Sequence, residues 1–325
     1  MPFTVEKYTK IHYQLWNEFV AQAKNATFLF HRDFMEYHQD RFEDFSLLIF
    51  DDTHDLIAVL PANVVGTIVF SHQGLTYGGI VTNETTKLAD FIATTKAILV
   101  FLKSQKIEKL QFKEIPSIYC QKPADELQYL LFLMQGNLVR RDVLSVLDLK
   151  TNFSFSRDRK NGIKRGIKNN LVVKEESNFE AFWNEILIPN LAEKHQTKPV
   201  HSLEEIQFLH SKFPKNIRQF NVYQNDKIVA GTTIFESELV AHSQYISGNS
   251  DKNELGSLDF LHDYLISNVF KEKKYFDFGI SNENQGKNIN EGLLYWKESF
   301  GARTFTQDFY EVEIQNHTFL DTVLI

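Results

Sequence analysis

The sequence has a single cysteine, few glycines and prolines, and no long apolar run. The lone Cys120 excludes an internal disulfide framework and any CxxC metal site, and it is typical of a reducing compartment. The apolar stretches, such as Ala97–Leu102 and Leu130–Met134, are far shorter than the ~20 residues that span a bilayer. The first residues, MPFTVEK, show no basic region followed by an apolar run. We therefore expect no signal peptide and a cytoplasmic protein.

Several catalytic signatures are also missing. The 11 histidines form no HExxH or other paired ligand spacing, so we expect no metal site. No P-loop, no GxSxG and no strand-linked GxGxxG occurs. The cysteine has no identifiable base near it in sequence, which favours a structural thiol. Zinc hydrolases, P-loop enzymes and serine hydrolases are thus disfavoured.

What the chain does contain is typical of a globular protein. Hydrophobic residues make up 43% of its 325 residues and charged residues 24%, with 14 Gly and 7 Pro, which excludes disordered, collagen-like and low-complexity chains. The 29 Phe and 12 Tyr predict a core rich in rings. The length fits one large domain or two domains of ordinary size.

The charge is unevenly distributed. The net charge is −7, yet Arg157 to Lys174 holds seven basic residues and one acid, Asp158. An anion-attracting patch on an acidic body follows from this distribution.

Hydrophobic periodicity predicts alternating helices and strands. The expected helices are Ile11–Asn25, Thr86–Lys103, Ala124–Met134, Arg157–Asn169, Phe179–His195, Leu258–Phe270 and Asn290–Phe300. The expected strands are Ser46–Phe50, Leu56–Asn63, Thr67–Gln73, Lys109–Ile115, Val143–Leu149, Val172–Glu175, Ile217–Tyr223, Ile228–Phe235, Val240–Ser247, Tyr275–Gly279 and Thr304–Glu313.

The order of these elements repeats once along the chain. Each copy has helices, three antiparallel strands in a meander, and then helix, strand, helix and strand. We therefore expect an α/β (α+β) protein of two domains, each a mixed, mostly antiparallel sheet flanked by helices. The expected boundaries are 1–150 and 151–325, with the junction near Lys150–Phe155.

This order is that of the GNAT acyltransferase fold, and two fused copies resemble the Fem-type (FemAB-like) family of peptidyltransferases. RDRKNGIKRGIKNNLVV (157–173) resembles the basic helix that opens the family's second domain, and LVAHSQYISG (239–248) resembles its strand with a tyrosine before a small-residue turn. YFDFG (275–279) is similar to the strand after it, and GLLYWKESFG (292–301, followed by Tyr310) is similar to the last helix, in which a Lys precedes Phe-Gly. TYGG (76–79) corresponds to the family's Gly-rich turn.

The resemblance implies two tandem GNAT-like domains and an acyl- or aminoacyl-transferring enzyme of cell wall biogenesis. Family members transfer an amino acid from aminoacyl-tRNA to a peptidoglycan precursor, and relatives acylate surface polysaccharides. The coiled-coil arm of some members is missing here, which puts binding of tRNA through that arm in doubt. No bound cofactor is implied.

The resemblance assigns the catalytic role first to Lys297, which matches the family lysine taken to stabilise charge at the transfer centre. A fixed ammonium can stabilise the oxyanion of acyl transfer or hold a phosphate. The alternative is a surface lysine whose stem covers Trp296, a residue we also place among the substrate contacts. Tyr245 is the second catalytic candidate, with Gln244 beside it, on a strand expected to splay and open the donor cleft. A core tyrosine is the alternative.

Arg157, Lys160, Lys164 and Lys168 are spaced so that they share one helical face, with Ile163 and Ile167 on a neighbouring, core-directed face. The four cations are candidates for phosphate or tRNA contact, and a solvated helix surface is the alternative. The patch has no interleaved aromatics, which disfavours base stacking. The remaining substrate-binding candidates are Tyr77, Gly78 and Gly79, where a plain turn is the alternative, and Arg32, Lys198 and His201, where the family places phosphate-binding residues.

The segment Asn253–Leu258 departs from the pyrophosphate loop of acetyl-CoA enzymes. It has one glycine, lacks the basic residue, and carries Glu254, which we expect to repel phosphate. This departure disfavours acyl-CoA without excluding it, so the donor is either aminoacyl-tRNA or acyl-CoA.

The leading hypothesis is a transferase that acylates an amine of an anionic small-molecule or lipid-linked cell-envelope precursor. The alternatives are an acyl-CoA-dependent N-acyltransferase on a nucleotide sugar and a non-catalytic binding protein of the same fold. DNA is not an expected partner. Peripheral contact with a membrane stays open, as does the oligomeric state.

Overall fold

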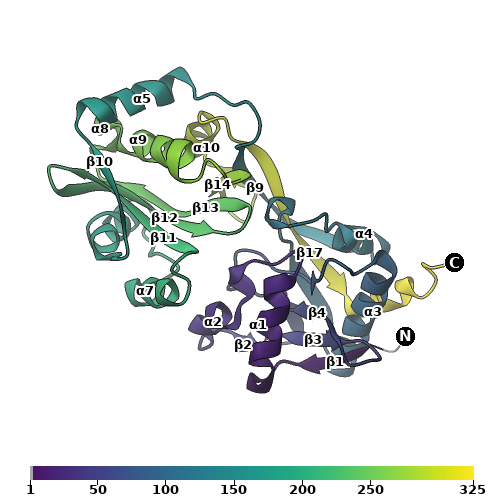
Figure 1. Cartoon of the computed structure of the whole chain (residues 1–325). Helices are drawn as coiled ribbons and strands as arrows, with labels where there is room; N and C mark the ends of the chain where they lie inside the picture. Colours follow the sequence, from purple (N-terminus) through teal and green to yellow (C-terminus); the bar gives the residue numbers. More distant parts are fainter. Residues whose placement is uncertain (1–2) are drawn as a thin grey trace. The chain divides into compact units, whose positions relative to one another are not determined.

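The computed structural model describes residues 3–325, apart from the side chains of residues 194 and 195. The chain forms two compact units (Figure 1). Unit 1 contains the chain up to Asp142 together with Thr306–Ile325, and unit 2 is Val143–Phe305. This division differs from the expected one at residue 150, because the chain changes unit inside two long strands, β9 (Asn137–Asp148) and β17 (Arg303–Glu313).

Each unit takes its last strand from the other half of the sequence. In unit 2, β9 pairs antiparallel with β14 (Tyr275–Ile280). In unit 1, β17 pairs antiparallel with β8 (Lys109–Lys113). The C-terminal residues therefore complete the first unit, which the order of elements alone did not predict.

Unit 1 holds two groups of strands. The first has the order β1 (Thr4–Lys7), β3 (Leu47–Phe50), β4 (Leu56–Leu60) and β7 (Val81–Thr82). The second runs from β17 and β8 to β6 (Ile68–Phe70), β5 (Asn63–Val65) and β2 (Glu43–Asp44). The helices are α1 (Tyr13–Gln22), α2 (Arg32–Met35), α3 (Leu88–Ser104) and α4 (Glu126–Leu133), with short 3₁₀ turns η1 (Lys10–His12), η2 (Phe28–Phe30), η3 (Glu36–His38), η4 (Ser117–Tyr119) and η7 (Ile314–Leu320).

Unit 2 is built on one twisted run of strands. β10 (Val172–Glu176), β11 (Ile217–Gln224), β12 (Lys227–Glu236) and β13 (Val240–Gly248) are antiparallel neighbours, β14 is parallel to β13, and β9 follows. The helical segments are α5 (Arg157–Lys168), the π-helical η5 (Phe182–Leu187) continuing into α6 (Ile188–His195), α7 (Leu203–Lys212), α8 (Lys252–Leu255), α9 (Ser257–Tyr264) continuing into the π-helical η6 (Leu265–Val269), and α10 (Glu291–Glu298). A small hairpin joins β15 (Asn282–Glu283) to β16 (Asn288–Ile289).

The helices of unit 2 lie on both faces of its strands. In Figure 1, α5, α8, α9 and α10 lie on one side and α7 on the other. The core under α9 is rich in rings, as the composition predicts: Phe276, Phe278 and Phe300 are all buried there. Unit 1 has its own core, in which α3 buries Ile98 and Leu102.

The buried face of α5 is formed by glycines, which corrects the expected packing of this helix. Gly162 and Gly166 are buried, while Ile167 is 62% exposed and Ile163 is half-buried. A Cβ on Gly166 would lie 2.6 Å from the Cβ of Phe260 in α9, so α5 approaches α9 more closely than isoleucine side chains allow. The prediction that Ile163 and Ile167 share the core-directed face is wrong for this reason.

The strands β13 and β14 separate after a short paired stretch. Their register joins Val240 to Tyr275, Ala241 to Phe276 and His242 to Asp277, and ends there. From there to Gly248, β13 is paired with β12 and no longer with β14, and an irregularity in its pairing with β12 leaves Gln244 without a register partner. The expected splayed strand is thus present in unit 2.

The corresponding point in unit 1 is filled by the chain itself. β6 runs parallel to β8 only as far as Phe70, and the following segment folds back along β8. Lys113 donates its backbone N–H to the Ser71 hydroxyl over 2.8 Å, and the N–H of Gly78 donates to the Lys113 carbonyl over 2.6 Å. Backbone therefore occupies the space that the separating strands open in unit 2.

All the expected helices and strands have counterparts, with shifted ends and some interruptions, but one full helix was not expected. α7 buries Ile206 and Leu209, and it begins with a reciprocal capping arrangement between Ser202 and Glu205. That Ser-x-x-Glu spacing is the signal in the sequence that could have found it. No helix in the described residues is long and apolar enough to cross a membrane.

Candidate functional site

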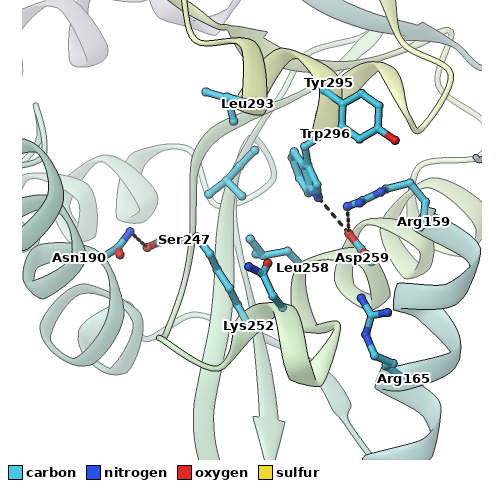
Figure 2. A pocket seen from close by; sticks show the side chains of 13 residues that line it. Arg159, Arg165, Asn190, Ser247, Lys252, Leu258, Asp259, Leu293, Tyr295 and Trp296 are labelled. Carbon is cyan, nitrogen blue, oxygen red and sulfur yellow. Dashed lines mark hydrogen bonds and ion pairs between the residues drawn. The ribbon is translucent and has the colours of Figure 1, made fainter.

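A cavity of about 520 Å³ lies in unit 2, beyond the point where β13 and β14 separate (Figure 2). It is surrounded by the end of β13 and by residues of α5, α6, α8, α9 and α10. The lining residues are Arg159, Arg165, Asn190, Ile246, Ser247, Lys252, Asn253, Leu258, Asp259, Gly292, Leu293, Tyr295 and Trp296. Its size is in the range of small-molecule and cofactor sites.

A buried carboxylate organises one wall of this cavity. Asp259 accepts a hydrogen bond from the Trp296 indole N–H over 2.9 Å and from the Arg159 guanidinium over 2.5 Å (Figure 2). Burial raises the pKa of Asp259, and the Trp296 hydrogen bond and the Arg159 charge oppose that rise. The carboxylate thus fixes the orientations of an aromatic and a cationic side chain at the cavity.

Two further cations line the cavity. Arg165 extends from α5 toward it in Figure 2, and its guanidinium makes no hydrogen bond or ion pair with the described residues. Lys252 comes from the segment that leads into α9. With Arg159, these side chains give the cavity three cations against the single carboxylate of Asp259. The net positive charge suits a phosphate-bearing ligand.

Close backbone packing places these cations at the cavity. Gly256, between α8 and α9, has φ +70°, and a Cβ there would overlap the carbonyl oxygen of Gly162. A Cβ on Gly162 would in turn overlap the Asp259 carboxylate. Glycine at both positions lets α5 lie against the start of α9, and the side chains of Arg159 and Arg165 therefore reach the cavity.

This geometry changes the expected role of the loop before α9. The side chain of Glu254 is exposed and is not one of the residues that line the cavity. The missing basic residue of the loop is compensated from α5. Arg159 and Arg165 were not predicted because the spacing of three and four selects a different face of α5. Lys252 and Asp259 belong to α8 and α9, and no motif in the sequence marks them.

Lys297 is almost fully buried, with 3% of its surface exposed. Its Nζ donates to the carbonyl oxygens of Gly279 and Ile280 over 3.0 and 2.6 Å. Burial lowers the pKa of the ammonium to about 8, and the charge of Asp277 opposes that shift. The side chain is thus not a solvated helix-surface lysine. It does not line the cavity, although its neighbour Trp296 does.

Tyr245 is buried, and it does not line the cavity either. Its hydroxyl oxygen accepts the backbone N–H of His201 over 3.1 Å and lies 2.6 Å from the Nδ1 of that histidine. Its ring packs edge-on against Trp183. The structure thus brings together two predicted residues, Tyr245 and His201, on the η5 side of β13. Gln244 is half-buried beside them.

The other predicted residues of unit 2 are exposed. Arg157, Lys160, Lys164 and Lys168 lie on the outer surface of α5, and Lys198 is also exposed. None of the five lines the cavity. The four cations of α5 form a basic surface on the outer side of this helix, with the exposed Ile167 among them.

The candidates of unit 1 are held in internal contacts. Arg32 is 2% exposed, forms ion pairs with Glu36 and Asp44, and stacks over the ring of Tyr8. It lines a second cavity of about 320 Å³, where these carboxylates already neutralise its charge.

The Gly-rich turn of unit 1 is also closely packed. The Tyr77 hydroxyl lies 2.9 Å from the Thr27 hydroxyl, so either group donates. A Cβ on Gly78 would overlap the Ser71 carbonyl oxygen, and Gly79 has φ +117°. Glycine at position 78 therefore allows two backbone segments to pack closely against each other.

The comparisons with known proteins agree on the fold. No protein-family model matches the sequence, and no curated protein matches it. Among solved structures, the chain is similar to FemX, with a TM-score of 0.66 at 10% identity over 96% of this chain and 98% of that one. It is also similar to L-PGS from Bacillus licheniformis (TM-score 0.58, 13% identity, 97% and 96%) and to a tandem GNAT protein from the clavulanic acid biosynthesis pathway (0.51, 11%, 96% and 99%). The chain therefore has the tandem GNAT-like fold of these proteins, which confirms the fold class and, at the level of fold, the Fem-type resemblance that the sequence predicts.

Proposed function

We propose that the protein is an acyl- or aminoacyl-transferase whose donor binds in the cavity of unit 2. The observation that carries the proposal is a cavity beside separating parallel strands, lined by Arg159, Arg165 and Lys252 and by the ring of Trp296. Both candidate donors, acyl-CoA and aminoacyl-tRNA, carry phosphates and a reactive acyl ester or thioester. The cations fit the phosphates, and Trp296 offers a flat apolar surface to the rest of the donor.

Unit 2 is the unit with this capacity, because the corresponding strand separation in unit 1 is occupied by residues 71–79. The proposal therefore assigns donor binding to unit 2 and leaves unit 1 for the acceptor or for a structural role.

Lys297 is proposed to stabilise the negative charge that develops on the acyl carbonyl oxygen. Two of its three ammonium hydrogens are held by the carbonyls of Gly279 and Ile280, which fixes the nitrogen and leaves one hydrogen to donate. A preorganised donor of this kind acts most strongly when it is shielded from water. With a pKa of about 8, the side chain keeps its charge at neutral pH.

The acceptor is proposed to be an amine on an anionic cell-envelope precursor, either peptidoglycan or surface polysaccharide. The similarity to FemX and to L-PGS supports this class, and the exposed cations of α5 supply a surface for an anionic or lipid-linked acceptor. An amine on a nucleotide sugar is the alternative acceptor if the donor is acyl-CoA. Both donors are cytoplasmic compounds, so the proposal places the reaction in the cytoplasm.

A transfer assay tests the proposal. The protein is incubated with acetyl-CoA or with alanyl-tRNA, and with either a peptide that carries a free lysine amine or an amino-sugar nucleotide as acceptor. The expected result is acceptor-dependent loss of one donor and formation of an amide. Absence of turnover in all four combinations, with a folded protein, contradicts the proposal and favours a non-catalytic binding protein.

A further inference from the structure

The last register pair between β13 and β14 consists of two side chains that also bind each other. The Nδ1–H of His242 donates to Oδ2 of Asp277 over 3.0 Å. The imidazole is 12% exposed, whereas the carboxylate is completely buried. At the point where the two strands separate, an imidazole that reaches the surface is thus held from its inner side by a buried anion.

The carboxylate is fixed through its second oxygen as well. Oδ1 of Asp277 accepts the backbone N–H of Gly279 over 2.7 Å. Gly279 has φ +71°, and a Cβ there would lie 3.2 Å from the Cε1 of His242. Glycine at this position therefore leaves room for the ring, and its peptide holds the carboxylate in place.

These contacts define which nitrogen of His242 is available. Because a carboxylate accepts at Nδ1, the neutral ring carries its hydrogen there and presents a lone pair at Nε2. Within the part of the chain that the structure describes, Nε2 has no hydrogen-bond partner. His262 and His210 differ, because their Nδ1 atoms pair with the backbone carbonyls of Leu258 and Ile217.

The same glycine links this pair to Lys297. The N–H of Gly279 binds Asp277, and its carbonyl accepts from the Lys297 ammonium over 3.0 Å. One peptide residue thus fixes both the carboxylate behind His242 and the cation proposed to stabilise the oxyanion. This arrangement has the parts of an acyl-transfer site: a base, an orienting carboxylate and a charge-stabilising donor.

We propose that His242 is the general base of the transfer and that Asp277 orients it. Nε2 takes a proton from the acceptor amine as the amine nitrogen forms its bond to the acyl carbon of the donor. The bond from that carbon to the donor oxygen or sulfur then breaks, and the imidazolium returns the proton to the leaving atom. The products are an amide and the deacylated donor. This inference rests on the proposed transferase function and deepens it.

The test compares the wild-type protein with His242→Ala, Asp277→Asn and the matched control His210→Gln. The donors are acetyl-CoA and alanyl-tRNA, and the acceptor is a peptide with a free lysine amine. We expect His242→Ala to lower kcat by about 10²–10⁴-fold with little change in KM, as for loss of a general base. Added imidazole should restore part of the rate. Asp277→Asn should lower kcat without changing KM, and His210→Gln should retain the wild-type kcat.

The outcomes separate the two proposals. Wild-type turnover together with an undiminished kcat in His242→Ala overturns the general base and leaves the transferase intact. A lowered kcat that imidazole does not restore also overturns it, because a structural defect gives that result. No wild-type turnover overturns both proposals. If Asp277→Asn does not fold, His242→Ala with added imidazole still tests the general base, because the His242 side chain reaches the surface and its removal leaves room for imidazole.

Discussion

The Lys297 ammonium donates to the carbonyl of Gly279, whose own N–H donates to Asp277. The lysine is therefore tied to the strand β14 and does not extend along the helix surface. A buried cation held by two backbone carbonyls is costly unless its charge is used or compensated, and Asp277 compensates part of it.

Replacing Lys297 by Met should remove the charge while keeping most of the buried volume. We expect kcat to fall about 10²–10³-fold, the range for loss of one oxyanion donor, with a small change in KM. The measurement is steady-state transfer with the donor that the wild-type protein uses. Lys287→Met, at an exposed position of the same unit, is the control and should retain the wild-type kcat. Equal kcat in both variants removes Lys297 from the mechanism.

Close packing of α5 on α9 makes a stability prediction. A methyl group on Gly162 would overlap the Asp259 carboxylate, so Gly162→Ala should lower the free energy of unfolding by about 1–3 kcal/mol. Gly292 also lies in a helix that lines the cavity, but a Cβ there meets nothing nearer than 3.9 Å. Gly292→Ala should leave stability unchanged or raise it by up to about 1 kcal/mol. Urea denaturation measures both, and equal destabilisation of the two variants contradicts this packing argument.

Glu114 predicts a pH effect on unit 1. Burial raises its pKa to about 7, with the charges of Asp308 and Asp125 adding to the rise. Between its ordinary pKa of 4.5 and about 7, the folded state holds a proton that the unfolded state has lost, so stability falls as the pH rises through this window. Across this window, the free energy of unfolding should fall by on the order of 3 kcal/mol because of Glu114.

Glu114→Gln mimics the protonated side chain, so the stability of this variant should not show the loss that Glu114 causes as the pH rises. Urea denaturation midpoints are measured for the wild type and the variant at pH 5 and at pH 8. Subtracting one protein from the other at each pH cancels the titration of all other groups. We expect the variant to gain on the wild type at pH 8. A difference that is the same at both pH values shows that Glu114 is not protonated in the folded state at pH 5.

Arg32, a candidate phosphate contact from the sequence, is held by internal contacts in the structure. Its guanidinium is held by Glu36 and Asp44 and stacks on Tyr8. Arg32→Met should destabilise the protein by roughly 3 kcal/mol, because two carboxylates lose their cation. Calorimetry in the absence of ligand measures this effect. A variant as stable as the wild type contradicts a structural role for Arg32.

Local patterns predicted most of the fold. Alternating apolar residues and amphipathic stripes located the strands and helices of both units, and their order predicted the tandem GNAT arrangement. The exchange of β9 and β17 between the units could not be predicted, because strand pairing between distant segments depends on tertiary structure. The inner face of α5 was missed for a related reason: glycines at 162 and 166 carry no apolar signal, yet they allow the closest approach to α9.

The candidate site was predicted in part. Trp296 lines the cavity as expected for a substrate contact, and the basic helix contributes to it, but through Arg159 and Arg165 instead of the four cations on its outer face. Which of several cations in one helix faces a cavity depends on the partner helix, and spacing alone does not give it. His242 and Asp277 lie in two quoted motifs, but only the register of β13 and β14 shows that they meet.

The measurement that tests the central claim most directly is donor binding by isothermal titration, with acetyl-CoA and with an aminoacylated RNA minihelix. The proteins compared are the wild type, Arg165→Gln and Lys168→Gln, since the two variants remove one cation each from the same helix and only Arg165 lines the cavity. For the donor that binds, Arg165→Gln should weaken affinity about 10–100-fold, as for loss of a charge-assisted hydrogen bond, and Lys168→Gln should change it much less. Equal affinity of Arg165→Gln and wild type, or a wild-type protein that binds neither donor, contradicts the assignment of the donor to this cavity.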